Sequence, residues 1–133
     1  MTVIRSMGVR GFCVPMPMGV WARGTVDPWG VTVNGRPVET YSRSEQHRIG
    51  IALQVAIAEL SGVGFAVVDE LDMLDAKNRE TMGVVLLRSA LEQVIILGTR
   101  EADSALPRGS ATLAAYRIGQ QDGRSVILER GAA

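Results

Sequence analysis

The chain has 133 residues, of which 47% are hydrophobic and 21% are charged, so it is long enough for one domain with a hydrophobic core. Fourteen basic and fourteen acidic residues cancel, and net charge therefore gives no reason to expect a nucleic acid or a membrane as partner. One cysteine and one histidine exclude an internal disulfide, a cysteine-rich metal site and a multi-histidine metal site.

The N-terminal residues carry glycine, proline and methionine without a clear period. They predict an irregular N-terminal arm over residues 1–24, followed by a domain over residues 25–133. Pro15 and Pro17 interrupt the one apolar run that imitates a signal peptide, and no run reaches the roughly 20 residues of a membrane helix. We therefore expect a cytoplasmic protein with no membrane partner.

The next elements are a hairpin and a helix. Asn34-Gly35 lies between short β-rich runs at residues 31–33 and 37–40, which predicts a hairpin turn. Ser42 and Glu45 have the spacing of a capping box, so a helix should begin here and end at Gly62. Its apolar stripe has helical spacing and consists of Ile49, Ala52, Leu53, Ala56, Ile57 and Leu60.

The apolar run at residues 65–68 predicts a buried strand of a parallel sheet. Asp69 and Glu70 follow directly, at the end of the strand where α/β sheets place their ligands. Asp69 suits Mg²⁺, which takes carboxylate and water oxygens, and Glu70 suits the orientation or deprotonation of a water. Taken alone, the pair fits a solvated acidic turn equally well.

The second half of the chain predicts a helix over residues 76–91 with Asp75 as its N-cap and with Met82, Val85, Leu86 and Ser89 on its buried side. A second buried strand is predicted at residues 94–97. The strand–helix–strand order predicts that the two strands are parallel. Residues 113–118 and 125–128 then predict a terminal hairpin.

The chain has one lysine, Lys77, among its fourteen basic residues. A phosphate-cradling P-loop requires G-x-x-x-x-G-K-[ST], and no glycine precedes Lys77 at that spacing. The sequence printed here therefore contains no Walker A motif.

Over about residues 30–130, the order of these motifs resembles the C-terminal lobe of an ABC-type ATPase head of the SMC, RecF and SbcC sort. The resemblance implies an α/β fold, the C-terminal half of a P-loop NTPase-like domain. Its short parallel sheet is flanked by helices and followed by a C-terminal β-hairpin. In that family, an N-terminal lobe carries Walker A, and the C-terminal lobe carries the signature motif, Walker B, the D-loop and the switch.

On this resemblance, residues 41–46 match the signature motif that approaches a nucleotide held by the opposing head. Ser42 stands where the family's serine meets the γ-phosphate, and Glu45 belongs to the same motif. Arg43 and Ser44 occupy positions that usually hold glycine, which permits close backbone approach to a phosphate.

The same resemblance assigns roles to four later residues. Asp69 matches the magnesium-side carboxylate of Walker B, and Glu70 matches its general base. Asp75 matches the end of the D-loop. Thr99 falls where a switch histidine often stands, and a threonine hydroxyl cannot take up a proton near neutral pH.

The resemblance implies ATP and Mg²⁺ as cofactors and an ATPase that is active only when a Walker A lobe completes it. The partner would be a Walker A-bearing N-lobe or a second ATPase head, supplied in trans or by a longer parent chain. A homo-oligomer is a further expectation, and DNA is an expected partner by family resemblance only.

Two alternatives stay open. The replaced glycines and the missing switch histidine favour a degenerate, non-hydrolysing lobe that acts as an interaction or regulatory module. The other is a phosphatase-like or receiver-like α/β domain with an acidic metal site. Such a domain would carry further acidic residues at other strand ends, whereas the second strand here runs into Gly98-Thr99-Arg100.

Overall fold

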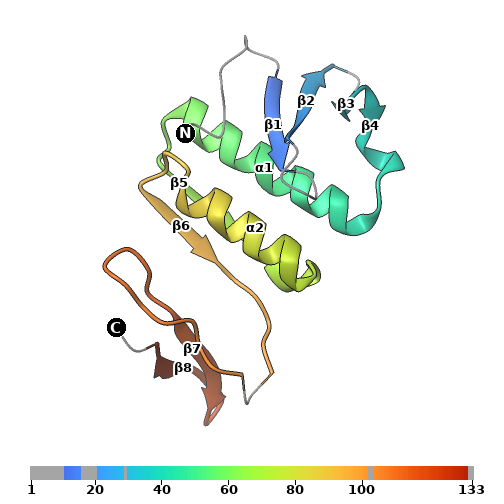
Figure 1. Cartoon of the computed structure of the whole chain (residues 1–133). Helices are drawn as coiled ribbons and strands as arrows, with labels where there is room; N and C mark the ends of the chain where they lie inside the picture. The colour runs from blue at the N-terminus through green and yellow to red at the C-terminus, as the bar shows by residue number, and fades with distance from the viewer. Residues whose placement is uncertain (1–10, 16–20, 29, 102–103, 132–133) are drawn as a thin grey trace. The chain divides into compact units, whose positions relative to one another are not determined.

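The computed structural model describes residues 11–15, 21–28, 30–101 and 104–131. It separates into two compact units, Met1–Thr99 and Arg100–Ala133, here called the N-terminal and C-terminal units (Figure 1). The described residues form a mixed α/β structure with short sheets and two α-helices, which confirms the predicted class at this level. The domain expected over residues 25–133 is divided at residue 99.

A four-stranded antiparallel sheet opens the N-terminal unit. It consists of β1 (Gly11–Pro15), β2 (Trp21–Asp27), β3 (Gly30–Val33) and β4 (Arg36–Pro37), in that order. The irregular arm expected over residues 1–24 is therefore wrong at residues 11–15 and 21–24, while residues 1–10 and 16–20 lie outside the described residues. The glycine and proline content of this segment gave no strand pattern, yet Val14 of β1 and Ala22 of β2 are buried in the core.

The predicted turn at Asn34-Gly35 is confirmed, since both residues have positive φ, +50° and +76°. The second strand of this hairpin is shorter than expected, because Val38–Thr40 form a 3-10 helix. The Thr40 hydroxyl donates to the Pro37 carbonyl over 2.7 Å. This local bond competes with continued strand pairing.

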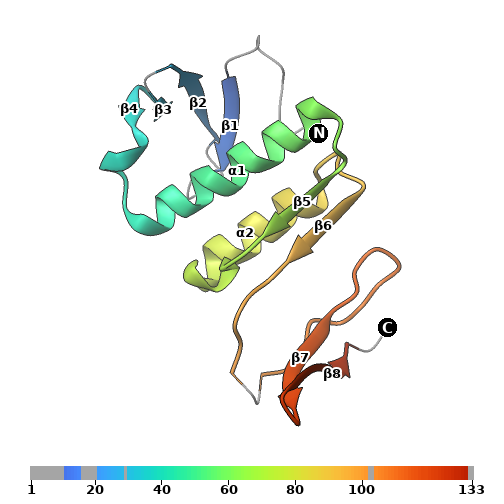
Figure 2. The same ribbon diagram turned by 180° about the vertical axis from the view of Figure 1, so that it is seen from behind.

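The helix α1 spans Arg43–Ser61 and ends at Gly62 in the left-handed conformation, as predicted. It lies between the β1–β4 sheet and the layer that contains α2, so it buries residues on two sides (Figures 1 and 2). Ile57 and Leu60 face neither layer and are 58% and 66% exposed, so the expected stripe is wrong at its C-terminal end. No helix among the described residues, this 19-residue one included, is long and apolar enough to cross a membrane.

The predicted parallel pair is confirmed as β5 (Phe65–Val68) and β6 (Gln93–Ile96), with Val67 opposite Ile95. The helix α2 (Ala76–Leu87) covers one face of this two-stranded sheet, where Ala66 and Val68 are buried. Phe65 and Val67 are exposed on the other face, which no helix of the described residues covers (Figure 2). The expectation of a buried strand is therefore wrong for half of the side chains of β5. It is also wrong for Ile95 and Ile96 of β6, which are 40% and 42% exposed.

The helix α2 buries Met82, Val85 and Leu86, as expected, but ends four residues earlier than predicted. Arg88 forms its C-cap, and the Ser89 hydroxyl donates to the Leu86 carbonyl over 2.7 Å. Because Ser89 satisfies a terminal carbonyl of the helix, it belongs to the end of the helix and not to its buried side.

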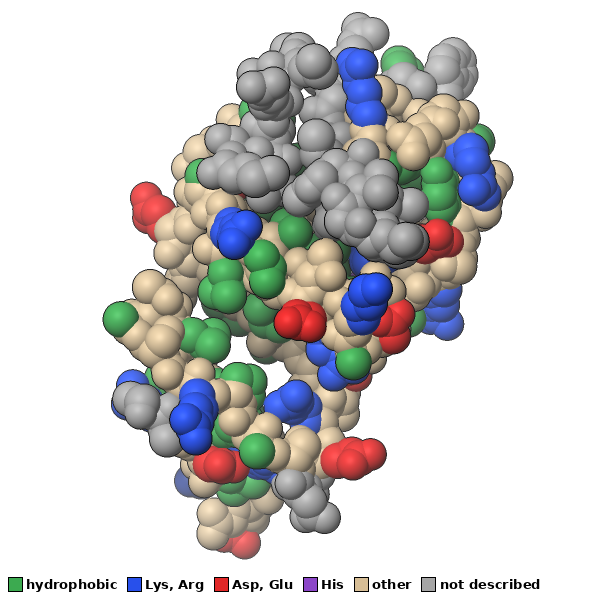
Figure 3. Space-filling model, in the orientation of Figure 1, with side chains coloured by type: hydrophobic (Ala, Val, Ile, Leu, Met, Phe, Trp, Pro, Cys, Tyr) green, Lys and Arg blue, Asp and Glu red, His purple; other side chains and the backbone are tan. Residues whose placement is uncertain are grey.

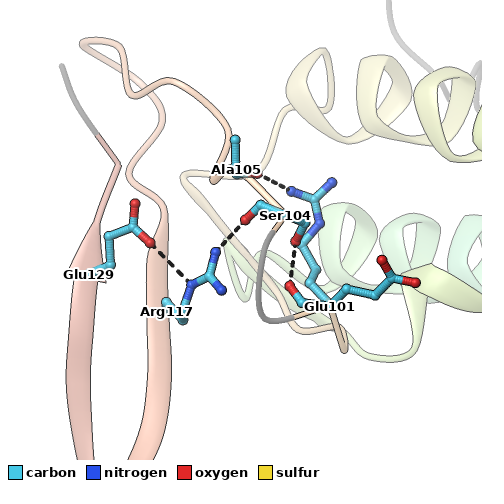
Figure 4. Close-up of polar contacts among 6 residues, drawn as sticks. Glu101, Ser104, Ala105, Arg117 and Glu129 are labelled. Carbon is cyan, nitrogen blue, oxygen red and sulfur yellow. Dashed lines mark hydrogen bonds and ion pairs between the residues drawn. The ribbon is translucent and has the colours of Figure 1, made fainter.

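The C-terminal unit is built on a hairpin of β7 (Tyr116–Gln121) and β8 (Arg124–Arg130). The predicted hairpin is confirmed, although β7 lies three residues later than expected and β8 extends beyond both expected bounds of the second strand. The Arg117 guanidinium contacts the Glu129 carboxylate at 3.1 Å and donates to the Ser104 carbonyl, and Arg100 donates to the Ala105 carbonyl over 2.8 Å (Figure 4). The bond from Arg117 to Ser104 is the contact that joins the preceding loop to its hairpin.

Candidate functional site

The carboxyl ends of β5 and β6 meet at one end of the sheet, because the strands are parallel. Asp69 and Glu70 follow β5, and Thr99 lies three residues beyond β6; all three are exposed. The two loops are close neighbours, since a Cβ atom at Gly98 would lie only 3.1 Å from Asp72 Oδ1. The structure therefore places the predicted Walker B pair and the predicted switch position at the same end of the sheet.

Asp69 and Glu70 form a tight turn directly after the strand. The Glu70 backbone N–H donates to Asp69 Oδ1 over 2.8 Å. Glu70 adopts the left-handed conformation, with φ +54° and ψ +33°, which is costly for a residue with a side chain. Leu71 and Leu74, both buried, anchor the 3-10 helix Leu71–Met73 that follows and hold this turn in place.

A shallow hollow of about 480 Å³ connects the acidic pair with the first turns of α1. Asp69 and Glu70 form one side, with Val67 and Val68 of β5. The opposite side comes from α1 and consists of Gln46, His47, Gly50, Ile51 and Gln54. The hollow therefore combines carboxylates, amides and an imidazole on a partly apolar base.

The N-terminus of α1 is capped as predicted. Glu45 Oε2 accepts hydrogen bonds from the Ser42 backbone N–H over 2.9 Å and from the Ser42 hydroxyl over 2.7 Å. The hydroxyl bond, followed by the backbone bond, lowers the pKa of Glu45 below its ordinary value. Because the Ser42 proton is donated to Glu45, the hydroxyl must leave this partner before it can donate to a ligand. Arg43 is exposed and Ser44 is half-buried.

Asp75 caps α2, as predicted. Its Oδ1 accepts the Asn78 backbone N–H over 2.9 Å and its Oδ2 accepts the Asn78 side-chain amide over 2.5 Å. The backbone bond and then the amide bond lower the pKa of Asp75. Asn78 Oδ1 in turn accepts Arg48 Nη1 over 3.0 Å, so Asp75 is connected to α1.

The predicted site residues thus fall into three groups, of which Asp75 at the start of α2 is one. Asp69 and Glu70 lie at the hollow, with Thr99 on the neighbouring loop, whereas Ser42, Arg43, Ser44 and Glu45 lie at the start of α1 and do not line that hollow. Sequence reasoning missed the α1 residues that face the acidic pair. The available signal was the polar sequence that follows the capping box, Gln46-His47, which departs from a purely apolar helix face.

The acidic residues can be tested against a bound magnesium ion. In the described part of the chain, no three His, Cys, Asp or Glu side chains are grouped to hold a metal ion. Mg²⁺ bound with nucleotide phosphates needs only one or two protein carboxylates, the other ligands being water and phosphate oxygens. The exposed Asp69 carboxylate, fixed through one oxygen by the Glu70 N–H, fits that limited requirement.

No protein-family model matches the sequence, and no curated protein matches it significantly.

Proposed function

We propose that this chain is the signature-motif and Walker B half of an ABC-type, P-loop NTPase-like ATPase head. A Walker A-bearing lobe, supplied in trans or by a longer parent chain, completes it. The observation that carries the proposal is the exposed Asp69-Glu70 pair at the carboxyl end of β5, in a parallel pair of strands, sharing a hollow with the start of a capped helix.

The proposal gives each predicted residue a role in ATP hydrolysis. Asp69 holds Mg²⁺, and Glu70 orients and deprotonates the attacking water. Ser42 and its neighbours Arg43, Ser44 and Glu45 face the phosphate held by the partner, where the helix N-terminus supplies backbone donors. Asp75 and Thr99 complete the surface that meets the nucleotide.

The open face of the β5–β6 sheet supports the need for a partner lobe. A two-stranded sheet is marginally stable by itself, and an apolar face in water is typical of an interaction surface. Phe65, Ile95 and Leu97 are 48%, 40% and 45% exposed. A second lobe that lies against these side chains would remove them from water.

A degenerate, non-hydrolysing lobe is the second candidate. It is favoured by the exposed Arg43 side chain at a position that usually holds glycine, and by Thr99 in place of a proton-accepting histidine. DNA remains a partner by resemblance alone. On the face drawn in Figure 3, basic and acidic side chains are interspersed and do not gather into a single-sign patch.

The test is reconstitution with the polypeptide of a neighbouring reading frame that carries G-x-x-x-x-G-K-[ST]. We expect ATP turnover only when both polypeptides are present. Glu70→Gln should preserve nucleotide-dependent association and slow turnover by roughly 10²-fold, since the general base is lost. Ser42→Arg should block association by bulk. The matched control for Glu70→Gln is Glu80→Gln, the same change at an exposed position of α2.

Three results would separate the two candidates. Turnover of Glu70→Gln at the unmodified rate would remove Glu70 from catalysis. Nucleotide-dependent association without any turnover would favour the non-hydrolysing lobe. Failure of the two polypeptides to associate would contradict both.

A further inference from the structure

Arg48 is the only charged side chain that is buried among the described residues, with 4% of its surface exposed. Removing a guanidinium from water is costly unless its charge and donors find partners. It lies on α1 about two turns beyond the Ser42 cap, on the side of the helix that reaches α2. The cost of this burial indicates that Arg48 has a specific role at this position.

The partners of Arg48 lead to the N-terminus of α2. Its Nη1 donates to Asn78 Oδ1 over 3.0 Å, while its Nε has no hydrogen-bond partner among the described residues. Asn78 donates both its backbone N–H and its side-chain amide to Asp75. The Asn78 amide therefore presents its oxygen to the cation and its nitrogen to the carboxylate, which connects Arg48 with Asp75 through one side chain.

Arg48 also acts on the N-terminus of α1. Glu45 lies one helical turn before it, and the Arg48 charge adds to the hydrogen bonds from Ser42 in lowering the Glu45 pKa. The same charge adds, after the Asn78 bonds, to the lowered pKa of Asp75. For both carboxylates the hydrogen bonds are the larger cause of the lowered pKa and the Arg48 charge is a smaller one, while the contact of Arg48 with Asn78 is what joins α1 to the start of α2.

We propose that Arg48 is a positioning residue that joins the Ser42 end of α1 to the Asp75 end of α2 and fixes the spacing between them. Neither end needs to hold a ligand for this connection to exist. What the two ends bind rests on the proposed ATPase function, in which Ser42 and Asp75 meet the same partner and must keep their spacing. A merely packing role for Arg48 would require no effect on either carboxylate.

The test is carbon-detected NMR titration of the Glu45 and Asp75 carboxyl groups in the full chain. Arg48→Met keeps the apolar stem and removes the charge, so both titration midpoints should rise. Arg48→Lys keeps the charge and loses the planar fork, so both midpoints should stay near the unmodified ones. Arg43→Met, which removes an exposed arginine of the same helix, is the matched control and should move neither.

The results that would overturn the proposal are measured on the chain without a partner or a nucleotide. Unchanged midpoints in Arg48→Met would show that Arg48 only fills space, and a shift at one carboxyl alone would show that it serves a single helix. If Arg48→Met does not fold, Arg48→Gln removes the charge and keeps a polar side chain, and both midpoints should again rise. Unchanged midpoints in Arg48→Gln would overturn the proposal. None of these outcomes depends on ATP or on a partner, so they are distinct from failure of the proposed function.

Discussion

The Gln54 side-chain amide of α1 donates a 2.7 Å hydrogen bond to the backbone carbonyl of Val67 in β5. The neighbouring carbonyls of Gly64 and Val68 accept hydrogen bonds from the β6 side, so Val67 directs its carbonyl to the opposite edge of the sheet. Gln54 therefore satisfies one backbone carbonyl on the outer edge of β5, where a further strand would otherwise pair.

Gln54→Leu tests the energetic value of this edge contact. Leucine and glutamine have similar helix propensities, so the change removes the hydrogen bond without weakening the helix itself. We expect the free energy of unfolding to fall by about 1 kcal/mol, measured by urea denaturation. Gln93→Leu, at an exposed glutamine of β6, is the control, and an equal loss in both variants would contradict a specific role for Gln54.

The parts of the fold that the sequence could predict are those set by residues close to one another in the chain. Ser42, Glu45 and Gly62 act on their own neighbours, so the bounds of α1 were predictable, as was the strand at residues 65–68. The exposure of Ile57 was not predictable, because the layers that pack against a helix decide which of its sides is buried.

The candidate site shows the same division. The positions of Asp69 and Glu70 at a strand end follow from a local pattern, and the structure confirms that position. The contacts of Gln54 with Val67 and of Arg48 with Asn78 join residues 13 and 30 positions apart, and no local pattern specifies them. The left-handed conformation of Glu70 was also missed, because glutamate has no preference for it.

The backbone of Glu70 predicts an unusual response to glycine. At an ordinary position, glycine is less stable than alanine by roughly 0.5–1 kcal/mol. At φ +54°, the side chain itself is unfavourable, so Glu70→Gly should be more stable than Glu70→Ala by about 1 kcal/mol. Glu80, exposed within α2, is the matched position, where alanine should be the more stable. If alanine is more stable than glycine at both positions, the backbone of Glu70 is not strained.

The Glu45 cap predicts a loss of stability in acid. Because the pKa of Glu45 is lowered in the folded chain, its contribution is complete above the unfolded value of about 4.3 and is lost as the pH falls through the lower folded value. Glu45→Gln should therefore reduce the free energy of unfolding at about pH 7, and this effect should become smaller as the pH is lowered to about 2.5. Urea denaturation at the two pH values measures this, and an equal effect at both would show that the charge of Glu45 is irrelevant.

The Arg117 contacts predict a local effect in the C-terminal unit. Arg117→Met removes both the ion pair with Glu129 and the hydrogen bond to the Ser104 carbonyl. Hydrogen exchange of the Ser104 N–H, which is bonded to the Glu101 carbonyl, should accelerate, while exchange within α1 should not change. Arg124→Met, on the same hairpin, is the control. Acceleration in both variants would assign the effect to lost charge and not to the specific contacts of Arg117.

The chain alone should bind ATP weakly or not at all, even though it carries the proposed Walker B carboxylates. Tight phosphate binding in this class of site relies on a glycine-rich loop and its lysine, and Lys77, the only lysine, lies in the first turn of α2. The backbone donors at the start of α1 offer a single phosphate contact, and the Ser42 hydroxyl is already donated to Glu45. Calorimetric titration with ATP and Mg²⁺ should therefore show no saturable binding in the micromolar range, with Ser42→Arg and Glu70→Gln giving the same result. Micromolar binding that Glu70→Gln or Ser42→Arg abolishes would mean that the chain forms a nucleotide site without a partner lobe, and the proposed division of the ATPase head would be wrong.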